Sequence, residues 1–265
     1  MLEPFVSPKS VAILGASNTP GKLGYAVLQN VLQYGFPGPI YPINPKGGEI
    51  LGLTAYKSVS EVPGPIDLVV VVIPSQFVAE ALEECGQKGV RGAVIISAGF
   101  RETGPEGMQR ERELVRIAQK YGMRLIGPNC LGIIDTFVPL NASFAATMPA
   151  QGTIAFMSQS GALCTSILDM ALAENVGFSR FVSLGNKADL NETDFLRAWA
   201  DDPHSRVITA YLEGITDGPT FMRTAREVTH RKPVITVKAG TTSGGSRAVS
   251  SHTGTLAGSD HAYDA

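Results

Sequence analysis

Several features that mark common protein classes are scarce in this sequence of 265 residues. It has only three cysteines, far apart and without a CxxC pair, so neither a disulfide scaffold nor a structural zinc site is expected. So few cysteines fit a reducing, cytoplasmic setting. The N-terminus lacks the apolar region of a signal peptide. The longest purely apolar run, residues 68–73, is far too short to span a bilayer, so we expect no membrane partner.

Charged side chains are also scarce, and neither sign dominates. They make up 17% of the chain, with 22 Lys and Arg against 24 Asp and Glu and a net charge of −2. A protein that binds nucleic acid needs a basic face, so we expect no nucleic-acid partner. Glycine, in contrast, is plentiful: 29 of 265 residues, about 11% against the usual 7%. Such a chain uses its backbone in tight turns and close approaches.

Short β-branched runs alternate with longer amphipathic stretches, which predicts βαβ units around parallel sheets. In the first half the expected strands are 11–14, 40–43, 68–73, 93–96 and 124–126, and the expected helices are 24–34, 76–88 and 106–121. Residues 139–152 have no periodicity and are interpreted as a connector. After them the expected elements are strand 153–157, helix 162–174, strand 181–183, helix 192–200, strand 207–211, helix 218–229 and strand 234–237.

The fold class is therefore expected to be α/β, with two doubly wound domains in tandem, 1–145 and 146–265. The last residues look like the start of another helix with no stop signal, which suggests a fragment of a longer polypeptide. In open parallel sheets, ligands bind outside the carboxyl ends of the strands. The loops that follow strands are therefore the ones to search for a site.

The first such loop is rich in glycine. Gly15, Ala16 and Ser17 end a strand, and Gly24 opens the next helix, so the backbone can approach a phosphate at a helix N-terminus. The spacing is not GxGxxG, and after the second strand stands Lys46 rather than an acid for a ribose, so NAD is disfavoured. Lys46 suits a ligand with an extra phosphate. The alternative is that Gly15 and Gly24 only permit close packing of strand and helix.

Three further loops follow predicted strands and should open on the same crevice. They contain Ile73 and Pro74, then Ser97, Ala98 and Gly99, then Asn129. The Asn129 amide can read a base edge or a pantetheine amide, or contact no ligand at all. Taken alone, each loop is more often plain turn chemistry than a ligand contact.

In this order, the motifs resemble the CoA-binding domain of NDP-forming acyl-CoA synthetases, which include succinyl-CoA synthetase α subunits and ADP-forming acetate–CoA ligases. They are Gly-Ala-Ser from 15, Asn-Pro-Lys-Gly-Gly from 44, Ser-Ala-Gly from 97 and Gly-Pro-Asn-Cys from 127. The resemblance continues in Ser-Gln-Ser-Gly from 158, Gly-Asn-Lys-Ala-Asp from 185, Leu-Glu-Gly from 212 and Ser-His-Thr-Gly from 251. It implies a CoA-binding Rossmann-like domain followed by a flavodoxin-like domain, and it is closer to the acetate branch than to the succinate branch.

The Ser-Gln-Ser-Gly motif joins a predicted strand to a predicted helix, where backbone N–H groups form a seat for an anion. A serine nucleophile elbow would need glycine at position 158, which holds a serine, so a serine hydrolase is rejected. The resemblance implies that Ser160 and Gly161 hold the phosphate of a phosphohistidine.

The resemblance also places that phosphohistidine at His252. A neutral imidazole nitrogen is a good phosphoryl acceptor near pH 7, and its second nitrogen needs a carboxylate, which the resemblance assigns to Glu213. On the residues alone, His252 can be structural or solvated, and Glu213 can be a solvated carboxylate at a strand end. No two histidines have metal-ligand spacing, so no metal site is expected.

By this resemblance, acyl-CoA and phosphate give acyl phosphate and CoA, His252 takes the phosphoryl group, and ADP then receives it to give ATP. The chain contains no ATP-grasp domain and no P-loop motif, so ADP/ATP and Mg²⁺ are expected on a partner domain or on the β subunit of a hetero-oligomer such as α2β2. Two alternatives remain open: a non-catalytic CoA- or nucleotide-binding regulatory module or acyltransferase-associated domain, and a Rossmann dehydrogenase, which the missing GxGxxG disfavours.

Overall fold

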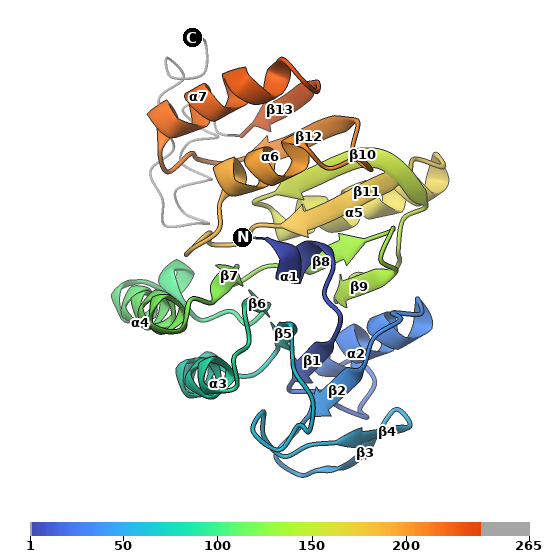
Figure 1. Ribbon diagram of the computed structural model, residues 1–265, viewed down its shortest axis with the longest axis vertical. Helices are drawn as coiled ribbons and strands as arrows, with labels where there is room; N and C mark the ends of the chain where they lie inside the picture. Colours follow the sequence, from blue (N-terminus) through green and yellow to red (C-terminus); the bar gives the residue numbers. More distant parts are fainter. Residues whose placement is uncertain (1, 240–265) are drawn as a thin grey trace.

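The computed structural model describes residues 2–239, and in it each half of the chain builds one sheet (Figure 1). The first sheet has five parallel strands in the order β2-β1-β5-β6-β7. These strands are β1 (Val11–Leu14), β2 (Ile40–Ile43), β5 (Leu68–Val71), β6 (Gly92–Ile95) and β7 (Arg124–Ile126). Every residue of β1, β5 and β6 is buried, as expected for a parallel sheet covered on both faces.

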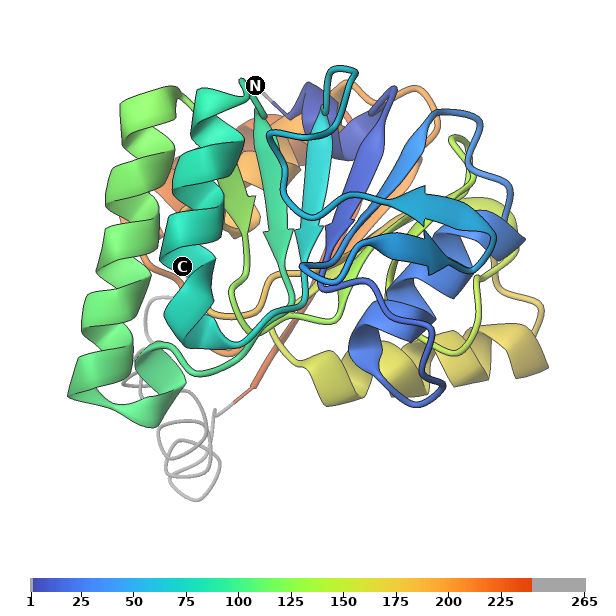
Figure 2. The same cartoon turned by 90° about the horizontal axis from the view of Figure 1, so that it is seen from below.

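Helices cover the two faces of the first sheet. They are the short α1 (Glu3–Val6), α2 (Leu23–Gln33), α3 (Ser75–Gln87), the 3₁₀ turn η1 (Arg101–Thr103) and α4 (Pro105–Tyr121). Figure 2 shows α3 and α4 side by side, with α2 on the opposite side of the strands. Alternate strand residues enter two cores: Val70 packs with α2, whereas Val69 and Val71 pack with α3 and α4.

The second sheet has six strands in the order β13-β12-β10-β11-β8-β9. They are β8 (Gly132–Asp135), β9 (Leu140–Ser143), β10 (Gln151–Ser158), β11 (Phe178–Ser183), β12 (Val207–Leu212) and β13 (Val234–Lys238). The last four are parallel, and β8 joins β11 in antiparallel pairing. The α5 helix (Gly161–Ala173) packs on one face, while α6 (Glu192–Ala200) and α7 (Gly218–Thr229) pack on the other.

Residues 139–152 are not the irregular connector that the sequence predicted. They contain β9, which forms a hairpin with β8, and the first two residues of β10. The sequence did not predict β9 because the strand contains polar residues, which usually indicate a loop. In the structure these side chains are fully buried, and Ser143 Oγ donates to Asn141 Oδ1 at 2.6 Å. The second sheet therefore begins with β8, before residue 145. The division into domains 1–145 and 146–265 stays a prediction.

A second hairpin, β3 (Gly48–Ile50) with β4 (Leu53–Ala55), was also absent from the predicted elements. Its turn uses the left-handed conformation at Leu51 and Gly52, with φ of +48° and +80°. The hairpin follows the Lys46 loop, and Asn18 fastens it to the glycine loop by donating from Nδ2 to the Glu49 carbonyl at 2.7 Å. These contacts place the two loops side by side.

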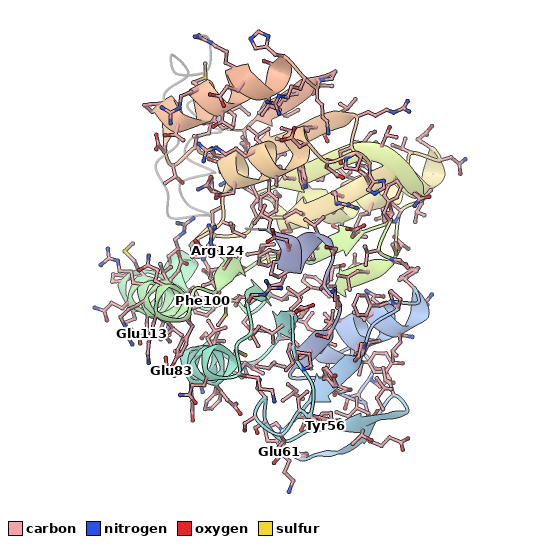
Figure 3. All side chains as sticks on the ribbon, in the orientation of Figure 1. Tyr56, Glu61, Glu83, Phe100, Glu113 and Arg124 are labelled. Atoms are coloured by element: carbon pink, nitrogen blue, oxygen red, sulfur yellow. The ribbon has the colours of Figure 1, made fainter. Side chains whose placement is uncertain are left out.

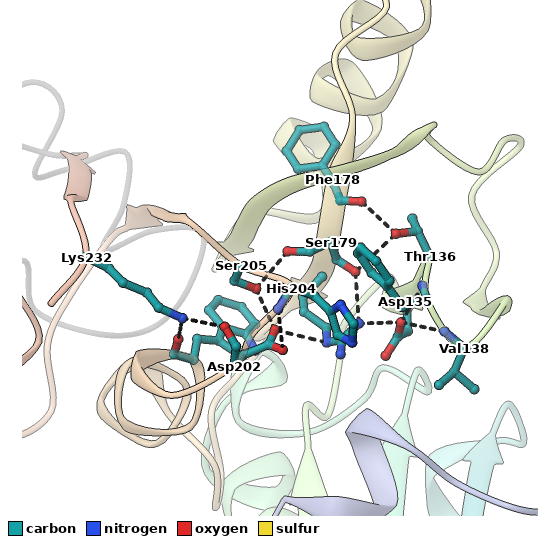
Figure 4. A network of polar contacts seen from close by, with 12 residues as sticks. Asp135, Thr136, Val138, Phe178, Ser179, Asp202, His204, Ser205 and Lys232 are labelled. Atoms are coloured by element: carbon teal, nitrogen blue, oxygen red, sulfur yellow. Dashed lines mark hydrogen bonds and ion pairs between the residues drawn. The ribbon is translucent and has the colours of Figure 1, made fainter.

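A buried polar network lies at the amino-terminal end of β11, at the opposite end of the strand from the ligand loops (Figure 4). Arg180 of β11 donates to Asp135 Oδ1, and the same carboxylate accepts the N–H groups of Phe137 and Val138 at 2.8 and 2.9 Å. Asp202 accepts from Ser205 Oγ at 2.6 Å. The network fixes the turn between β8 and β9, so it has a structural role.

Arg124, at the start of β7, lies where the two halves of the molecule meet (Figure 3). Its guanidinium donates from Nε and Nη2 to the two carboxylate oxygens of Asp189, at 2.9 and 3.1 Å. Asp189 also accepts the N–H of Leu125 at 2.8 Å. Such paired hydrogen bonds fix direction as well as distance, so the segment after β11 is held against β7.

None of the helices in residues 2–239 has the length and apolar character that crossing a membrane demands.

Candidate functional site

The carboxyl ends of four parallel strands lead into one cavity of about 430 Å³ between the two sheets. Ala98 and Asn129 follow β6 and β7 of the first sheet, and Gln159, Gly161 and Asn186 follow β10 and β11 of the second. Three residues predicted as ligand contacts, Ala98, Asn129 and Gly161, are thus brought together from the two halves of the chain. This is where ligands of open parallel sheets bind.

The walls of this cavity are apolar and its polar groups are uncharged. Leu23, Ile96, Leu131 and Phe144 supply much of the lining, and no charged side chain of the described residues takes part. Cys130 also lines it, but burial raises the pKa of its thiol to about 12. A thiol with so high a pKa stays protonated at neutral pH and is not a nucleophile.

The glycine loop after β1 needs its glycines for packing. Gly15 has φ +92°, and a Cβ there would lie 2.7 Å from the Val72 carbonyl oxygen. A Cβ on Gly24 would lie 1.9 Å from the Gly15 carbonyl oxygen, so α2 can approach β1 only with glycine at that position. These two glycines therefore permit the close packing, and the contact of Gly15, Ala16 and Ser17 with a ligand stays a prediction.

Lys46 lies beside this loop with its side chain exposed. Asn44 makes the link, because its Nδ2 donates to the Ala16 carbonyl at 2.8 Å while its Oδ1 accepts the Lys46 N–H at 2.9 Å. The side chain of Ser17 accepts the N–H of Thr19 at 3.0 Å. The backbone of Lys46 is thus held near the glycine loop, and the contact of its ammonium with an anionic ligand stays a prediction.

The other predicted contact loops are joined to each other. Ser97 Oγ donates to the Ile73 carbonyl at 2.6 Å, and Pro74 lies directly before the first residue of α3. The N–H groups of Gly99 and Phe100 donate to Glu102 Oε1 at 2.6 and 3.0 Å. The loop that carries Ala98 is therefore fixed at both ends.

Asn186 connects this loop to the second half of the chain. Its buried Nδ2 donates to Glu102 Oε2 at 2.7 Å and to Glu111 Oε2 at 2.8 Å, and its Oδ1 accepts from Asn129 Nδ2 at 3.3 Å. Burial alone would raise the pKa of Glu102, but hydrogen bonds from Asn186 and from the loop N–H groups lower it. Burial raises the pKa of Glu111. One carboxamide thus joins both halves at the cavity.

The predicted phosphate seat lies at the start of α5. Ser160 caps this helix by accepting the Leu163 N–H at 3.2 Å. A Cβ added to Gly161 would meet nothing within 4 Å, so the space beside this residue is open. Uncapped N–H groups at a helix N-terminus attract anions, and Gly161 lines the shared cavity.

Glu213 follows β12 and is buried, at 8% exposure, so it is not the solvated carboxylate of the alternative interpretation. The N–H groups of Glu213 and Gly214 donate to Gln159 Oε1 at 2.7 and 3.0 Å. Lys187 Nζ donates to the Gly214 carbonyl at 2.6 Å and to Glu192 Oε2 at 2.7 Å. Burial lowers the pKa of Lys187, and the Glu192 carboxylate opposes that shift. The turn that carries Glu213 is therefore held from two sides.

His252 lies outside the described residues, so its position relative to Glu213 stays a prediction. Within residues 2–239, no group of three or more His, Cys, Asp or Glu side chains is arranged to hold a metal ion.

Sequence reasoning missed Glu102, Glu111 and Gln159, although one of them carries a signal. The buried face of α4 runs through Gly107, Glu111, Leu114 and Ala118, so Glu111 is an acid on an apolar stripe. Such a residue marks either an ion pair or a buried hydrogen-bond acceptor. Glu102 and Gln159 carry no comparable signal, because the partners that connect them to the rest of the site, Asn186 and Glu213, lie 84 and 54 residues away.

Comparisons with known proteins agree with the arrangement of the site. Residues 9–136 match a family model described as a CoA binding domain, and residues 151–265 match one described as a succinyl-CoA ligase like flavodoxin domain. The chain is 51% identical to the acetate–CoA ligase [ADP-forming] II subunit alpha of Pyrococcus furiosus, over 100% of this chain and 58% of that protein. It is 30% identical to the succinate–CoA ligase [ADP-forming] subunit alpha 2 of Archaeoglobus fulgidus, over 74% of this chain and 68% of that protein.

The chain belongs to the NDP-forming acyl-CoA synthetase family. A solved member, the dinucleotide forming acetyl-coenzyme A synthetase 1 of Ca. Korarchaeum cryptofilum in complex with phosphate and ADP, superposes with a TM-score of 0.96 at 45% identity. The match covers 100% of this chain and 57% of that structure. The chain thus spans somewhat more than half the length of the acetate–CoA ligase relatives. The predicted α/β class, with a CoA-binding domain before a flavodoxin-like domain, is confirmed.

Proposed function

We propose that this chain is the CoA-binding and phosphohistidine-carrying part of an ADP-forming acyl-CoA synthetase. The complete enzyme converts acyl-CoA, phosphate and ADP into carboxylic acid, CoA and ATP. The observation that carries the proposal is the shared cavity, in which Ala98 and Asn129 of the CoA-binding half face Gly161 at the start of α5. An acyl group delivered from one half and a phosphate held by the other half meet in this space.

The first half binds CoA along the loops that end its strands. The glycine loop of Gly15, Ala16 and Ser17 is tied to Lys46 through Asn44, and Ser97 is tied to Ile73. These connections support one continuous rim that offers backbone groups and a cationic ammonium to a ligand with several phosphates. CoA supplies the thiol that carries and receives the acyl group.

The second half carries the phosphoryl group. A nitrogen of His252 attacks the phosphorus of the acyl phosphate, the bond from phosphorus to the acyl oxygen breaks, and the carboxylate leaves. Glu213 accepts the N–H of the other imidazole nitrogen and keeps the attacking nitrogen unprotonated. Backbone N–H groups at Gly161, beside Ser160, receive the phosphoryl oxygens, and this positioning and electrostatic stabilisation is what phosphoryl transfer needs.

A partner completes the reaction. The relatives named as alpha subunits, their greater length and the ADP in a solved member support an ATP-grasp β subunit or domain that holds ADP/ATP and Mg²⁺, in a hetero-oligomer such as α2β2. The three cysteines are free and buried, which supports a cytoplasmic location.

Labelling of the complete enzyme with ATP carrying a labelled γ-phosphate, in the presence of Mg²⁺, tests the proposal. The expected result is an acid-labile phosphoenzyme that His252→Ala abolishes and Glu213→Gln reduces at least ~10-fold. If His252→Ala keeps the label, the assignment of the histidine is wrong. If the wild-type enzyme takes no label yet binds CoA, the chain is the non-catalytic module of the alternative interpretation.

A further inference from the structure

The carboxamide of Gln159 has a single orientation. Its Oε1 accepts two backbone N–H groups, those of Glu213 and Gly214, at 2.7 and 3.0 Å. An amide nitrogen cannot accept these bonds, so the carboxamide cannot be turned over. The backbone of Gln159 is also fixed, because its N–H donates to the Tyr211 carbonyl at 3.1 Å.

This orientation leaves the two N–H bonds of Nε2 free of the Glu213 turn, and Gln159 is one of the residues that line the cavity. Among the hydrogen bonds of residues 2–239, Nε2 donates to none. The residue lies directly before Ser160, the cap of α5, and two residues before Gly161, whose surroundings are open. A fixed side-chain donor therefore stands next to the backbone donors of the first turn of α5.

We propose that Gln159 is a ligand-binding residue whose Nε2 donates a hydrogen bond to a phosphoryl oxygen in the cavity. The inference rests on the proposed function and adds a residue to it. The same carboxamide holds the Glu213 turn through Oε1, so phosphate binding and the placement of Glu213 depend on one side chain. Lys187 supports the arrangement from the other side by donating to the Gly214 carbonyl.

An oxyanion suits this donor better than the other parts of the substrates. The donors from Gln159 and the start of α5 are uncharged, and no charged side chain lines the cavity in the described part of the chain. Hydrogen bonds to an ionised acceptor are about twice as strong as those between neutral groups, and apolar neighbours strengthen them further. The acyl chain finds its environment in the apolar wall of Leu23, Leu131 and Phe144 instead.

Gln159→Glu in the complete enzyme separates binding from positioning. Glutamate keeps an acceptor for the N–H groups of Glu213 and Gly214, but it removes the donor and adds a negative charge. We expect the KM for inorganic phosphate to rise about 10- to 100-fold in the conversion of acyl-CoA, while the KM for CoA in the reverse direction stays within about 2-fold. Gln151→Glu, the same change at the exposed start of the same strand, is expected to alter neither value.

An unchanged KM for phosphate in Gln159→Glu overturns the inference. Gln159→Ala then shows the reason: if it raises the KM for phosphate while Gln159→Glu does not, Gln159 only positions the Glu213 turn. Equal thermal unfolding midpoints for Gln159→Glu and Gln151→Glu show that folding is not the cause of the effect. The proposed function fails separately, when wild-type enzyme forms no phosphoenzyme or when Glu213→Gln behaves as wild type.

Discussion

Asn186 and Gln159 each use a neutral carboxamide to hold neighbouring groups in place. The Nδ2 of Asn186 donates to two carboxylates of the first half, and the Oε1 of Gln159 accepts two N–H groups of one turn. Both side chains line the cavity. Neutral amides fix direction without bringing a charge into an apolar space, where an unpaired charge would be costly.

Glu111 gives a pH-dependent test of this arrangement. Its pKa is raised by burial from 4.5, so in the window between 4.5 and the raised value the folded state holds more protons than the unfolded state. The stability that the Glu111 carboxyl contributes is therefore full below pH 4.5 and is lost as the pH rises through the folded-state pKa. A glutamine side chain does not titrate, so the free energy of unfolding of Glu111→Gln minus that of wild type should increase with pH in this window, by up to about 1.4 kcal/mol per pH unit.

Glu113→Gln is the matched control for Glu111→Gln, on the exposed face of the same helix. A hydrogen bond from Arg116 lowers the pKa of Glu113, so its contribution to stability has the opposite pH dependence, and solvent weakens it. Urea unfolding of both variants between about pH 4 and pH 8 makes the comparison. A difference for Glu111→Gln that stays flat or decreases over this range contradicts the account of the buried acid.

At single residues, the sequence was informative where a motif lay in a strand-end loop. Ala98, Asn129 and Gly161 were predicted as ligand contacts and do line one cavity. The residues that hold them were missed, because hydrogen bonds between positions 54 to 84 residues apart leave no local pattern. The contact of Ala98, Asn129 and Gly161 with a ligand stays a prediction.

Among the elements, those with a clear hydrophobic period agree with the prediction residue by residue. This holds for β1, β2, β7, α6 and α7. Continuous apolar runs predict buried strands, and apolar residues repeating every 3.6 positions predict helices. Both patterns are local, so they can be recognised without knowing the tertiary contacts. The β8 and β9 hairpin was missed because β9 carries buried polar side chains instead of an apolar pattern. Part of what holds it comes from far along the chain, such as the bonds of Asn30 Nδ2 to the carbonyls of Ser143 and Ala145 at 2.8 Å.

The close approach of α2 to β1 predicts the effect of a single methyl group. In Gly24→Ala the new Cβ would lie 1.9 Å from the Gly15 carbonyl oxygen, so the helix must move away from the strand. Overpacking of this kind typically costs about 1–3 kcal/mol, so we expect about 2 kcal/mol of lost stability in urea unfolding. We also expect weaker CoA binding in titration calorimetry, because the loop between these elements shifts.

Gly218→Ala provides the comparison, since Gly218 also lies in the first turn of a helix and a Cβ there would meet nothing within 4 Å. It should change the stability by less than about 0.5 kcal/mol. Equal effects of the two substitutions would mean that Gly24 is not required for the packing of α2 on β1.

At the scale of the whole molecule, the two sheets are fastened together beside the cavity that they share. Arg124 binds Asp189 across the junction, and Asn186 binds Glu102 and Glu111. Both connections come from the segment after β11. This arrangement keeps the strand ends of the two halves facing each other, so that a ligand bound by one half is within reach of the other.

The near-neutral charge of the chain fits this design. Two phosphate-bearing ligands are expected to be held mainly by backbone N–H groups, helix N-termini and the exposed ammonium of Lys46, so a large excess of basic residues is not required. The plentiful glycines of the sequence lie partly in these loops, and at Gly15, Gly24 and Gly127 a side chain would collide with neighbouring backbone.

The most direct test of the central claim uses acyl-CoA and labelled inorganic phosphate without any nucleotide. If the two halves meet in one reaction space, the complete enzyme incubated with acetyl-CoA and labelled phosphate should acquire an acid-labile label on the peptide that contains His252. The label should depend on acetyl-CoA, and it should be absent in His252→Ala. An enzyme that makes ATP from acetyl-CoA, phosphate and ADP, yet carries no label on that peptide, would contradict the account.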